Sequence, residues 1–283
     1  MILERIRDPK DVKDLNKIET QQLCDELRDF LVENVSRTGG HLASNLGVVE
    51  LTVAIHRVFD TSKDRLVFDV GHQCYVHKAL TGRQAQFDKL RQYEGLSGFP
   101  NPRESEHDAF IAGHASNSVS VALGMARGRT LLHDNYHVLA LIGDGAMGGG
   151  LSFEGLNDAG ASGEPMIVIL NDNGMSINSN VGGMSRHLSK LRNNPSYYEF
   201  KKRYRRALGT TQAGKKVYEL SHDVKTALKK SFYPGSTMFE DMGFKYMGPV
   251  DGHDVEALTQ TLMLAKEIRH PVLLHVNTVK GKG

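Results

Sequence analysis

The stretch HVLALIGDGAMGGGLSFEGLNDAGASGEPMIVILNDN, residues 137–173, decides the fold of this chain. Residues 137–144 and 165–170 are short apolar runs of the kind that form buried strands. Between them lie a glycine-rich turn and a helical pattern over 151–162. Strand, turn, helix and strand in this order form a right-handed crossover, the unit of a parallel sheet. The stretch therefore predicts an α/β protein.

The flanking sequence repeats this alternation, with apolar residues at helical spacing followed by short apolar runs. The predicted helices cover 23–35, 44–58, 116–132 (capped by Ser116 or Asn117) and 254–268, and the further strands cover 65–70 and 271–279. We expect a parallel sheet with helices on both faces, and ligands at the carboxyl ends of its strands.

We interpret residues 1–283 as a single domain in which 177–250 is a largely helical, basic and mobile excursion with weak or absent strand signals. Residues 186–230 contain 13 Lys and Arg against 3 Asp and Glu, with aromatic residues interleaved. Such a segment could bind nucleic acid. We favour a solvated amphipathic insertion over nucleic-acid binding, because no nucleic-acid motif accompanies the segment. We therefore expect no nucleic-acid partner.

The composition is that of an ordinary soluble protein: 40% of the 283 residues are hydrophobic and 24% are charged. The sequence contains no run of eighteen apolar residues, so it predicts no membrane span. The N-terminal residues lack the apolar centre of a secretion signal. The two cysteines, Cys24 and Cys74, have no metal or redox spacing. These features favour a cytoplasmic protein without a membrane partner.

Three interpretations compete for LIGDGAMGGG, residues 141–150. Its glycines could serve only a tight turn, since glycine adopts positive φ at no steric cost. They also match the Gly-x-Gly-x-x-Gly loop of nicotinamide or flavin enzymes. Asp144 counts against that second interpretation, because its carboxylate would repel a diphosphate bound to the same turn.

The third interpretation places a divalent cation between Asp144 and a bound diphosphate. Mg²⁺ takes oxygen ligands, usually one or two protein groups together with phosphate oxygens. The next predicted strand ends in Asn171-Asp172-Asn173, which offers amide oxygens. One crossover separates Asp144 from Asn173, so both are expected at neighbouring strand ends.

A GDG turn followed after about thirty residues by an asparagine pair resembles the cofactor motif of thiamine diphosphate enzymes. The resemblance implies that thiamine diphosphate and Mg²⁺ are the cofactors. It also implies the metal ligands, which would be the Asp144 carboxylate, the Asn173 amide oxygen and the backbone carbonyl of Met175.

Further stretches are similar to the 1-deoxy-D-xylulose-5-phosphate synthase family over essentially the whole chain. They are GGHLASNLGVVELT (39–52), FDVGHQCYVHKALTGR (68–83), GLSGFPNPRESEHDAF (95–110), GHASNSVSVALGMA (113–126), NDNGMSINSNVGGMS (171–185), MGPVDGHDVEAL (247–258) and HVNTVKGKG (275–283). The resemblance implies a transketolase-like transferase that condenses pyruvate with glyceraldehyde 3-phosphate, with loss of CO₂, for isoprenoid, thiamine and pyridoxal synthesis.

Four histidines follow glycines: His41, His72, His114 and His253. An isolated histidine usually packs or caps a turn, and a three-histidine zinc site lacks any short ligand spacing. The resemblance implies proton transfer by His41, since a histidine titrates near neutral pH. It implies a cofactor site lined by His72, Gly113, His114, Ala115, Gly145, Ala146 and Asn173. We expect His77 and His107 to be structural.

The sequence departs from the family at Ala115 and Asn117, where serine and threonine are usual. The resemblance also implies pyrimidine-binding and C-terminal domains, which supply the cofactor-activating glutamate and most substrate-phosphate contacts, and we expect these domains to be absent from this chain. We therefore expect little activity from this chain alone, and a homo-oligomer or a complex with a chain carrying those domains. The alternatives are a non-catalytic cofactor-binding or assembly module and an NAD-dependent oxidoreductase.

Overall fold

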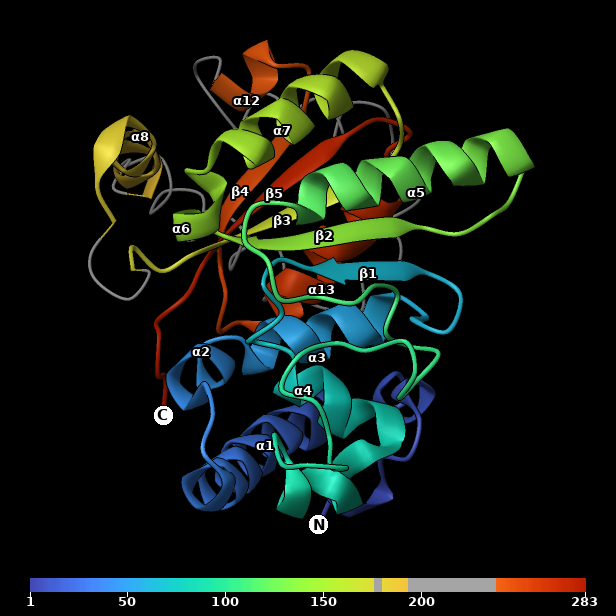
Figure 1. The fold of residues 1–283 in the computed structure, drawn as a ribbon, viewed down its shortest axis with the longest axis vertical. Coiled ribbons are helices and arrows are strands. Elements are labelled where there is room, and N and C mark those ends of the chain that lie inside the picture. Colours follow the sequence, from blue (N-terminus) through green and yellow to red (C-terminus); the bar gives the residue numbers. More distant parts are fainter. Residues whose placement is uncertain (176–179, 193–237) are drawn as a thin grey trace, which may run out of the picture.

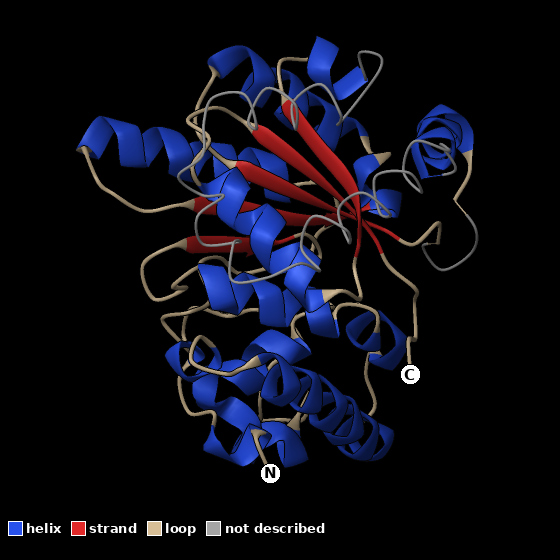
Figure 2. Cartoon of the chain, turned by 180° about the vertical axis from the view of Figure 1, so that it is seen from behind, coloured by secondary structure: helices blue, strands red, loops and turns tan. Residues whose placement is uncertain are grey.

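The computed structural model describes residues 1–175, 180–192 and 238–283. Five parallel strands form one sheet in the order β1-β2-β3-β5-β4 (Figures 1 and 2). The strands are β1 (Arg65–Phe68), β2 (Val138–Gly143), β3 (Ile167–Asp172), β4 (Lys245–Asp251) and β5 (Val272–Asn277). The predicted parallel sheet is confirmed, including the β2–β3 crossover around which the sequence is organised.

Helices cover both faces of the sheet, as predicted (Figure 1). On one face lie α3 (Val49–Val58) and α13 (Val255–Lys266), with α1 (Lys17–Thr38), α2 (Leu42–Leu46) and α4 (Tyr75–Lys78) beyond them. On the other lie α5 (Ser118–Leu132), α7 (Gly150–Ser162) and α12 (Met238–Asp241), and α6 (Asp144–Met147) and α8 (Gly182–Arg192) lie near the carboxyl end of the sheet. Short helical turns cover Leu3–Arg5, Pro9–Val12, Ala79–Arg83 and Gln84–Lys89.

The central strands are apolar throughout because both of their faces are buried. In β2, Leu139 and Leu141 pack with the cluster on the α3 and α13 side. Ala140 and Ile142, the alternate residues, pack with the cluster on the α5 and α7 side. Successive side chains of a strand point to opposite faces, so a strand covered on both sides has no polar alternation. This explains why residues 137–144 can be recognised as a buried strand from the sequence.

The expectation that strands are weak or absent through residue 250 is wrong, because β4 occupies Lys245–Asp251. It is an edge strand, and its pairing with β5 shifts register between Met247 and Val250. The shift lies at Gly248-Pro249, and Gly and Pro are typical of edge strands and bulges rather than of central strands. Within the rest of the predicted excursion, α8 is helical as expected, and 176–179 and 193–237 lie outside the described residues.

Several predicted helix starts differ from the structure, and the helix expected over 23–35 begins earlier, at Lys17. The helix expected over 44–58 is divided into α2 and α3 around Gly47 and Val48. The predicted cap position is confirmed at Asn117, the residue before α5, but the Asn117 side chain makes no capping hydrogen bond. Instead the carboxylate of Asp69, just after β1, accepts hydrogen bonds from the backbone N–H groups of Ser116 (2.8 Å) and Ser118 (3.1 Å). A side chain remote in sequence therefore performs the capping.

A buried polar cluster joins α3, α4 and the loop before α5. His56 Nε2 lies 3.0 Å from His77 Nδ1, and His77 Nε2 lies 2.9 Å from Asp108 Oδ1. Arg83 donates to both oxygens of Asp108, at 2.7 and 2.8 Å. His107 bonds Thr61 at 2.9 Å. The structural roles expected for His77 and His107 are consistent with these contacts, which hold elements of the fold together.

We predict that Gly160→Ala in α7 destabilises the protein by about 1–3 kcal/mol, as overpacking does. A Cβ at 160 would lie 1.9 Å from the Met242 carbonyl oxygen, so the backbone after α12 would have to move. The control is Gly124→Ala in α5, where a Cβ meets no described atom within 4 Å. That control should gain roughly 0.5–1 kcal/mol from helix propensity. Urea unfolding measures both, and equal effects would contradict the prediction.

None of the helices in the described ranges is long and apolar enough to cross a membrane.

Candidate functional site

The carboxyl ends of β1, β2 and β3 bring the predicted site residues to one edge of the sheet (Figure 1). β2 runs directly into Asp144, and β3 runs directly into Asn173. Gly143 pairs in register with Asn171, so the two strand ends are neighbours. His72 follows the end of β1 on the far side of β2. The parallel topology thus gathers residues that are distant in sequence, as expected.

Asp144 begins the short helix α6 and is buried. Its Oδ2 accepts hydrogen bonds from the Gly174 backbone N–H (2.8 Å) and from Asn180 Nδ2 (2.7 Å). These bonds attach the end of β2 to the loop that follows β3. Burial, followed by the neighbouring Asp172 carboxylate, raises the pKa of Asp144 to about 7. The ends of β2 and β3, which we call the corner, therefore hold two acidic side chains, Asp144 and Asp172, and each disfavours the charged form of the other.

Asp172 is the second of these acids and is completely buried. Its Oδ2 lies 2.9 Å from His275 Nε2, and the His275 Nδ1 lies 2.7 Å from the hydroxyl of Tyr246. Arg192 of α8 lies 3.4 Å from Oδ1. Burial alone would raise the pKa of Asp172, but the bond with His275 holds it below its ordinary value. Asp172 is thus the more acidic member of the pair, supported from β5.

The loop after β3 carries the other predicted metal ligands. Asn173 Oδ1 accepts a hydrogen bond from the Met175 backbone N–H at 3.0 Å, and Gly174 has φ of 74°. Gly174 N–H donates to Asp172 as well as to Asp144. The loop is therefore folded tightly against both acids, with Asn173 partly exposed and the Met175 side chain exposed. The metal role of these two residues stays a prediction.

Two turns from different segments meet beside Asp144. The Ser116 hydroxyl donates to the Ala146 carbonyl at 2.7 Å, so the 113–116 segment adjoins the GDG turn. The backbone N–H of Val70 donates to the His114 carbonyl at 3.2 Å, which attaches the same segment to the end of β1. Gly113, His114, Ala115 and Gly145 are exposed, and Ala146 is partly exposed. These residues lie together at the rim of the corner.

His41 and His72 lie close to each other, with ring centroids 5.4 Å apart in an edge-to-face arrangement. Each is partly buried. Burial and the charge of Arg91 lower the pKa of His41. Burial, together with the nearby His41 and Lys280, lowers the pKa of His72 to about 4. Both rings are therefore neutral at pH 7, the state in which an imidazole can accept a proton.

We predict that the His72 ring titrates with a midpoint near pH 4 rather than near 6.5. Because the folded-state pKa is depressed, the folded state disfavours protonation, and stability falls as pH drops from about 6.5 towards 4. NMR titration of the ring, assigned with His72→Gln, measures the midpoint. A midpoint for His72 above pH 6 would contradict the environment described here.

The other Gly-His pairs have different surroundings. His253 Nδ1 lies 3.0 Å from Glu50 Oε2, and its Nε2 accepts the Val279 backbone N–H at 2.9 Å. This histidine therefore attaches the C-terminal segment to α3. Among the described residues no group of three His, Cys, Asp or Glu side chains is arranged to hold a metal ion. The zinc alternative is therefore not supported within the described residues. This result does not bear on the predicted Mg²⁺ site, because that site has one carboxylate, one amide oxygen and one backbone carbonyl as its protein ligands.

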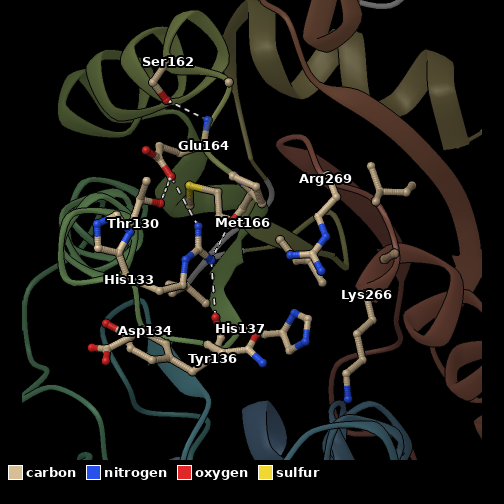
Figure 3. Close-up of a pocket in the computed structure, with 18 residues that line it drawn as sticks. Thr130, His133, Asp134, Tyr136, His137, Ser162, Glu164, Met166, Lys266 and Arg269 are labelled. Atoms are coloured by element: carbon tan, nitrogen blue, oxygen red, sulfur yellow. Dashed lines mark hydrogen bonds and ion pairs between the residues drawn. The ribbon is translucent and has the colours of Figure 1, made fainter.

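A cavity of about 460 Å³ lies at the opposite, amino-terminal edge of the sheet (Figure 3). It is lined by the ends of α5, α7 and α13 and by the starts of β2 and β3. Thr130 and Glu164 lie next to each other in its wall, where the Thr130 hydroxyl donates a hydrogen bond of 2.7 Å to the Glu164 carboxylate. None of the predicted site residues lines this cavity, so it is separate from the carboxyl-edge corner.

Several residues of the corner are absent from the sequence-based prediction. Asp69 and Asn180 are two of them, together with the fully buried Asn45 and Tyr75 beside His41. Asp69 could have been suspected, because an acid just after a buried strand lies at the edge where ligands bind. Asn45 carries no such signal, since it lies within a short helix and two of its three partners, His72 and Tyr75, are remote in sequence.

Comparison with known proteins gives consistent results. A family model described as 1-deoxy-D-xylulose-5-phosphate synthase matches residues 3–278. The 1-deoxy-D-xylulose-5-phosphate synthase of Clostridium acetobutylicum is 50% identical over 282 residues, covering 100% of this chain and 45% of that protein. That of Alkaliphilus oremlandii is 52% identical, covering 99% of this chain and 45% of that protein. The chain therefore spans about half the length of these relatives.

Solved structures with a similar fold are transketolases. The enzyme from Campylobacter jejuni superposes with a TM-score of 0.64 at 20% identity, covering 93% of this chain and 38% of that one. The enzyme from Leishmania mexicana superposes with a TM-score of 0.64 at 19% identity, covering 93% and 37%. These likenesses establish the fold. With a family model matched from residue 3 to residue 278 and relatives about 50% identical along its whole length, this chain belongs to the 1-deoxy-D-xylulose-5-phosphate synthase family.

Proposed function

We propose that this chain provides the thiamine diphosphate- and Mg²⁺-binding half of a 1-deoxy-D-xylulose-5-phosphate synthase. The observation that carries the proposal is the contact between Asp144 and the loop after β3, made through the Gly174 N–H at 2.8 Å. It brings the GDG turn and the asparagine loop together, within a chain of this family.

The chemistry of the corner fits Mg²⁺. Hard oxygen donors suit this ion, which is commonly bound by one or two protein groups and phosphate oxygens. Asp144 offers a buried carboxylate, Asn173 an amide oxygen and Met175 a backbone carbonyl. Asp172 adds a second negative charge behind Asp144, and a divalent cation would offset the repulsion between the two acids. In this proposal these three groups hold the ion.

The remaining predicted residues would hold the cofactor. The turn of the exposed Gly145 and the partly exposed Ala146 presents backbone groups beside Asp144, and Gly113, His114 and Ala115 adjoin it. Thiamine diphosphate, when bound, supplies an electron sink for carbon–carbon bond chemistry. His72 would contact the cofactor as a neutral ring, and His41 would hold or move a proton near the reacting carbon.

The activity of the whole protein is part of the proposal. Its reaction would be condensation of pyruvate with glyceraldehyde 3-phosphate, with loss of CO₂, for isoprenoid and thiamine biosynthesis. The chain would act in the cytoplasm as a homo-oligomer, or in a complex with a chain that carries the remaining part of the site.

Calorimetry tests the proposal directly. The chain is titrated with thiamine diphosphate in the presence of Mg²⁺ and then of EDTA, and binding is expected only with the metal. Mixing the chain with a separately produced remainder of a family member should then yield 1-deoxy-D-xylulose 5-phosphate from the two substrates. Absence of metal-dependent binding would refute the cofactor role.

The same experiments separate the alternatives. Metal-dependent binding without product in any mixture would favour a non-catalytic cofactor-binding or assembly module. NADH binding that persists in EDTA and in Asp144→Ala would favour an oxidoreductase. The position of Asp144 argues against the latter, because its carboxylate lies at the turn where a dinucleotide diphosphate would bind.

A further inference from the structure

One buried amide connects the two turns that carry His41 and His72. Asn45 of α2 is completely buried. Its Nδ2 donates to the His41 carbonyl at 2.9 Å and to the His72 carbonyl at 2.8 Å. Its Oδ1 accepts the backbone N–H of Tyr75 at 2.7 Å. An asparagine amide has two N–H donors, so both are used, one for each histidine.

Tyr75 provides a second connection to the same place. It is completely buried at the start of α4, and its position is set in part by the bond from its N–H to Asn45. Its hydroxyl lies 3.4 Å from the His41 backbone nitrogen and 3.5 Å from the His41 Nδ1. Asn45 therefore acts on His41 twice, directly at the carbonyl and through Tyr75 at the ring.

The bonds of Asn45 differ from those of an ordinary buried asparagine. Asn34 of α1 is also buried, and its Nδ2 donates to the Phe30 carbonyl of its own helix at 2.8 Å. That bond is local and crosses no gap between segments. The Nδ2 of Asn45 bonds one carbonyl beside its own helix and one after β1, and both belong to the histidines of the site.

We infer that Asn45 is a positioning residue of the cofactor site, which sets the spacing between the His41 and His72 rings. The inference rests on the proposed function, because it gives the two histidines their role at the cofactor. A side chain that binds both backbones holds the rings at their 5.4 Å separation before any ligand arrives. The other hydrogen bonds between these turns in the described part of the chain are longer, from the Tyr75 hydroxyl to His41 at 3.4 and 3.5 Å.

The test uses Asn45→Asp, which keeps the shape and the acceptor but removes both N–H donors. Asn45→Ala removes all three bonds without burying a charge, and serves if the first variant does not fold. Asn34→Asp is the matched control. NMR measures the ring-to-ring contact between His41 and His72 and their ring chemical shifts in the chain without ligand. Calorimetry then measures thiamine diphosphate binding with Mg²⁺.

In the Asn45 variants the contact between the rings should be lost, and affinity for the cofactor should fall about ten-fold, as for other supporting residues of a site. The control should keep both properties, even if its thermal stability falls equally. Parent-like ring contact and affinity in the folded Asn45 variants would overturn the inference and leave the proposed function standing. If the parent chain itself fails to bind the cofactor, the proposed function fails, and the NMR contact still decides whether Asn45 positions the rings.

Discussion

Asp144→Asn should reduce Mg²⁺-dependent thiamine diphosphate affinity by about 100-fold or more, since it replaces a charged ligand and even supporting residues contribute about 10–100-fold. The fold should survive, because an asparagine oxygen can still accept the bonds from Gly174 and Asn180. Calorimetry with and without EDTA measures the affinity. Asp134→Asn, an exposed change at the opposite edge of the sheet, is the control and should bind as the parent does.

Stability provides an independent check on the same variant. The pKa of Asp144 is raised to about 7 in the fold by burial and by Asp172, so ionising this carboxyl lowers stability as pH rises from about 4 to 7. In EDTA, Asp144→Asn should therefore melt at a higher temperature than the parent at pH 8, with a smaller difference at pH 5. A variant that binds cofactor like the parent, or that melts far below it at pH 8, would contradict the role assigned to Asp144.

Asp108→Ala should lower the free energy of unfolding by about 3–5 kcal/mol, the usual result of removing one partner from a buried ion pair. The change leaves Arg83 with Glu104 as its nearest remaining carboxylate, at 3.6 Å, and removes the acceptor of His77. It also leaves the Asn101 backbone N–H without its 2.8 Å bond. Urea unfolding at pH 7 measures the loss.

The control for Asp108→Ala is Asp158→Ala, which removes an exposed partner of Arg127 and should leave stability unchanged. The pH dependence follows from the same contacts. Burial alone would raise the pKa of Asp108, but the bonds from His77 and Arg83 hold it far below its ordinary value. The stabilisation is therefore fully present above about pH 4 and is lost only in stronger acid. Equal losses in the two variants would contradict the assigned role of the buried cluster.

Much of the fold could be predicted because the central strands are buried on both faces. The apolar runs within 137–144 and 165–170 favour buried strands, and the helix between them favours a parallel crossover. The same topology places Asp144 and Asn173 at adjacent strand ends. The edge strand β4 could not be predicted in this way, because Gly248 and Pro249 interrupt its pattern.

The same distinction between local and long-range information applies to the residues of the site. The amino-acid sequence by itself determined which strands end at the acidic corner, since chain order and apolar pattern are local properties. Only the tertiary structure decided how Asn45 reaches both histidines, how Asp69 caps α5, and how Asp172 is paired with His275. Those contacts join segments that are far apart along the chain, and short-range patterns of hydrophobicity carry no information about which distant polar groups will meet.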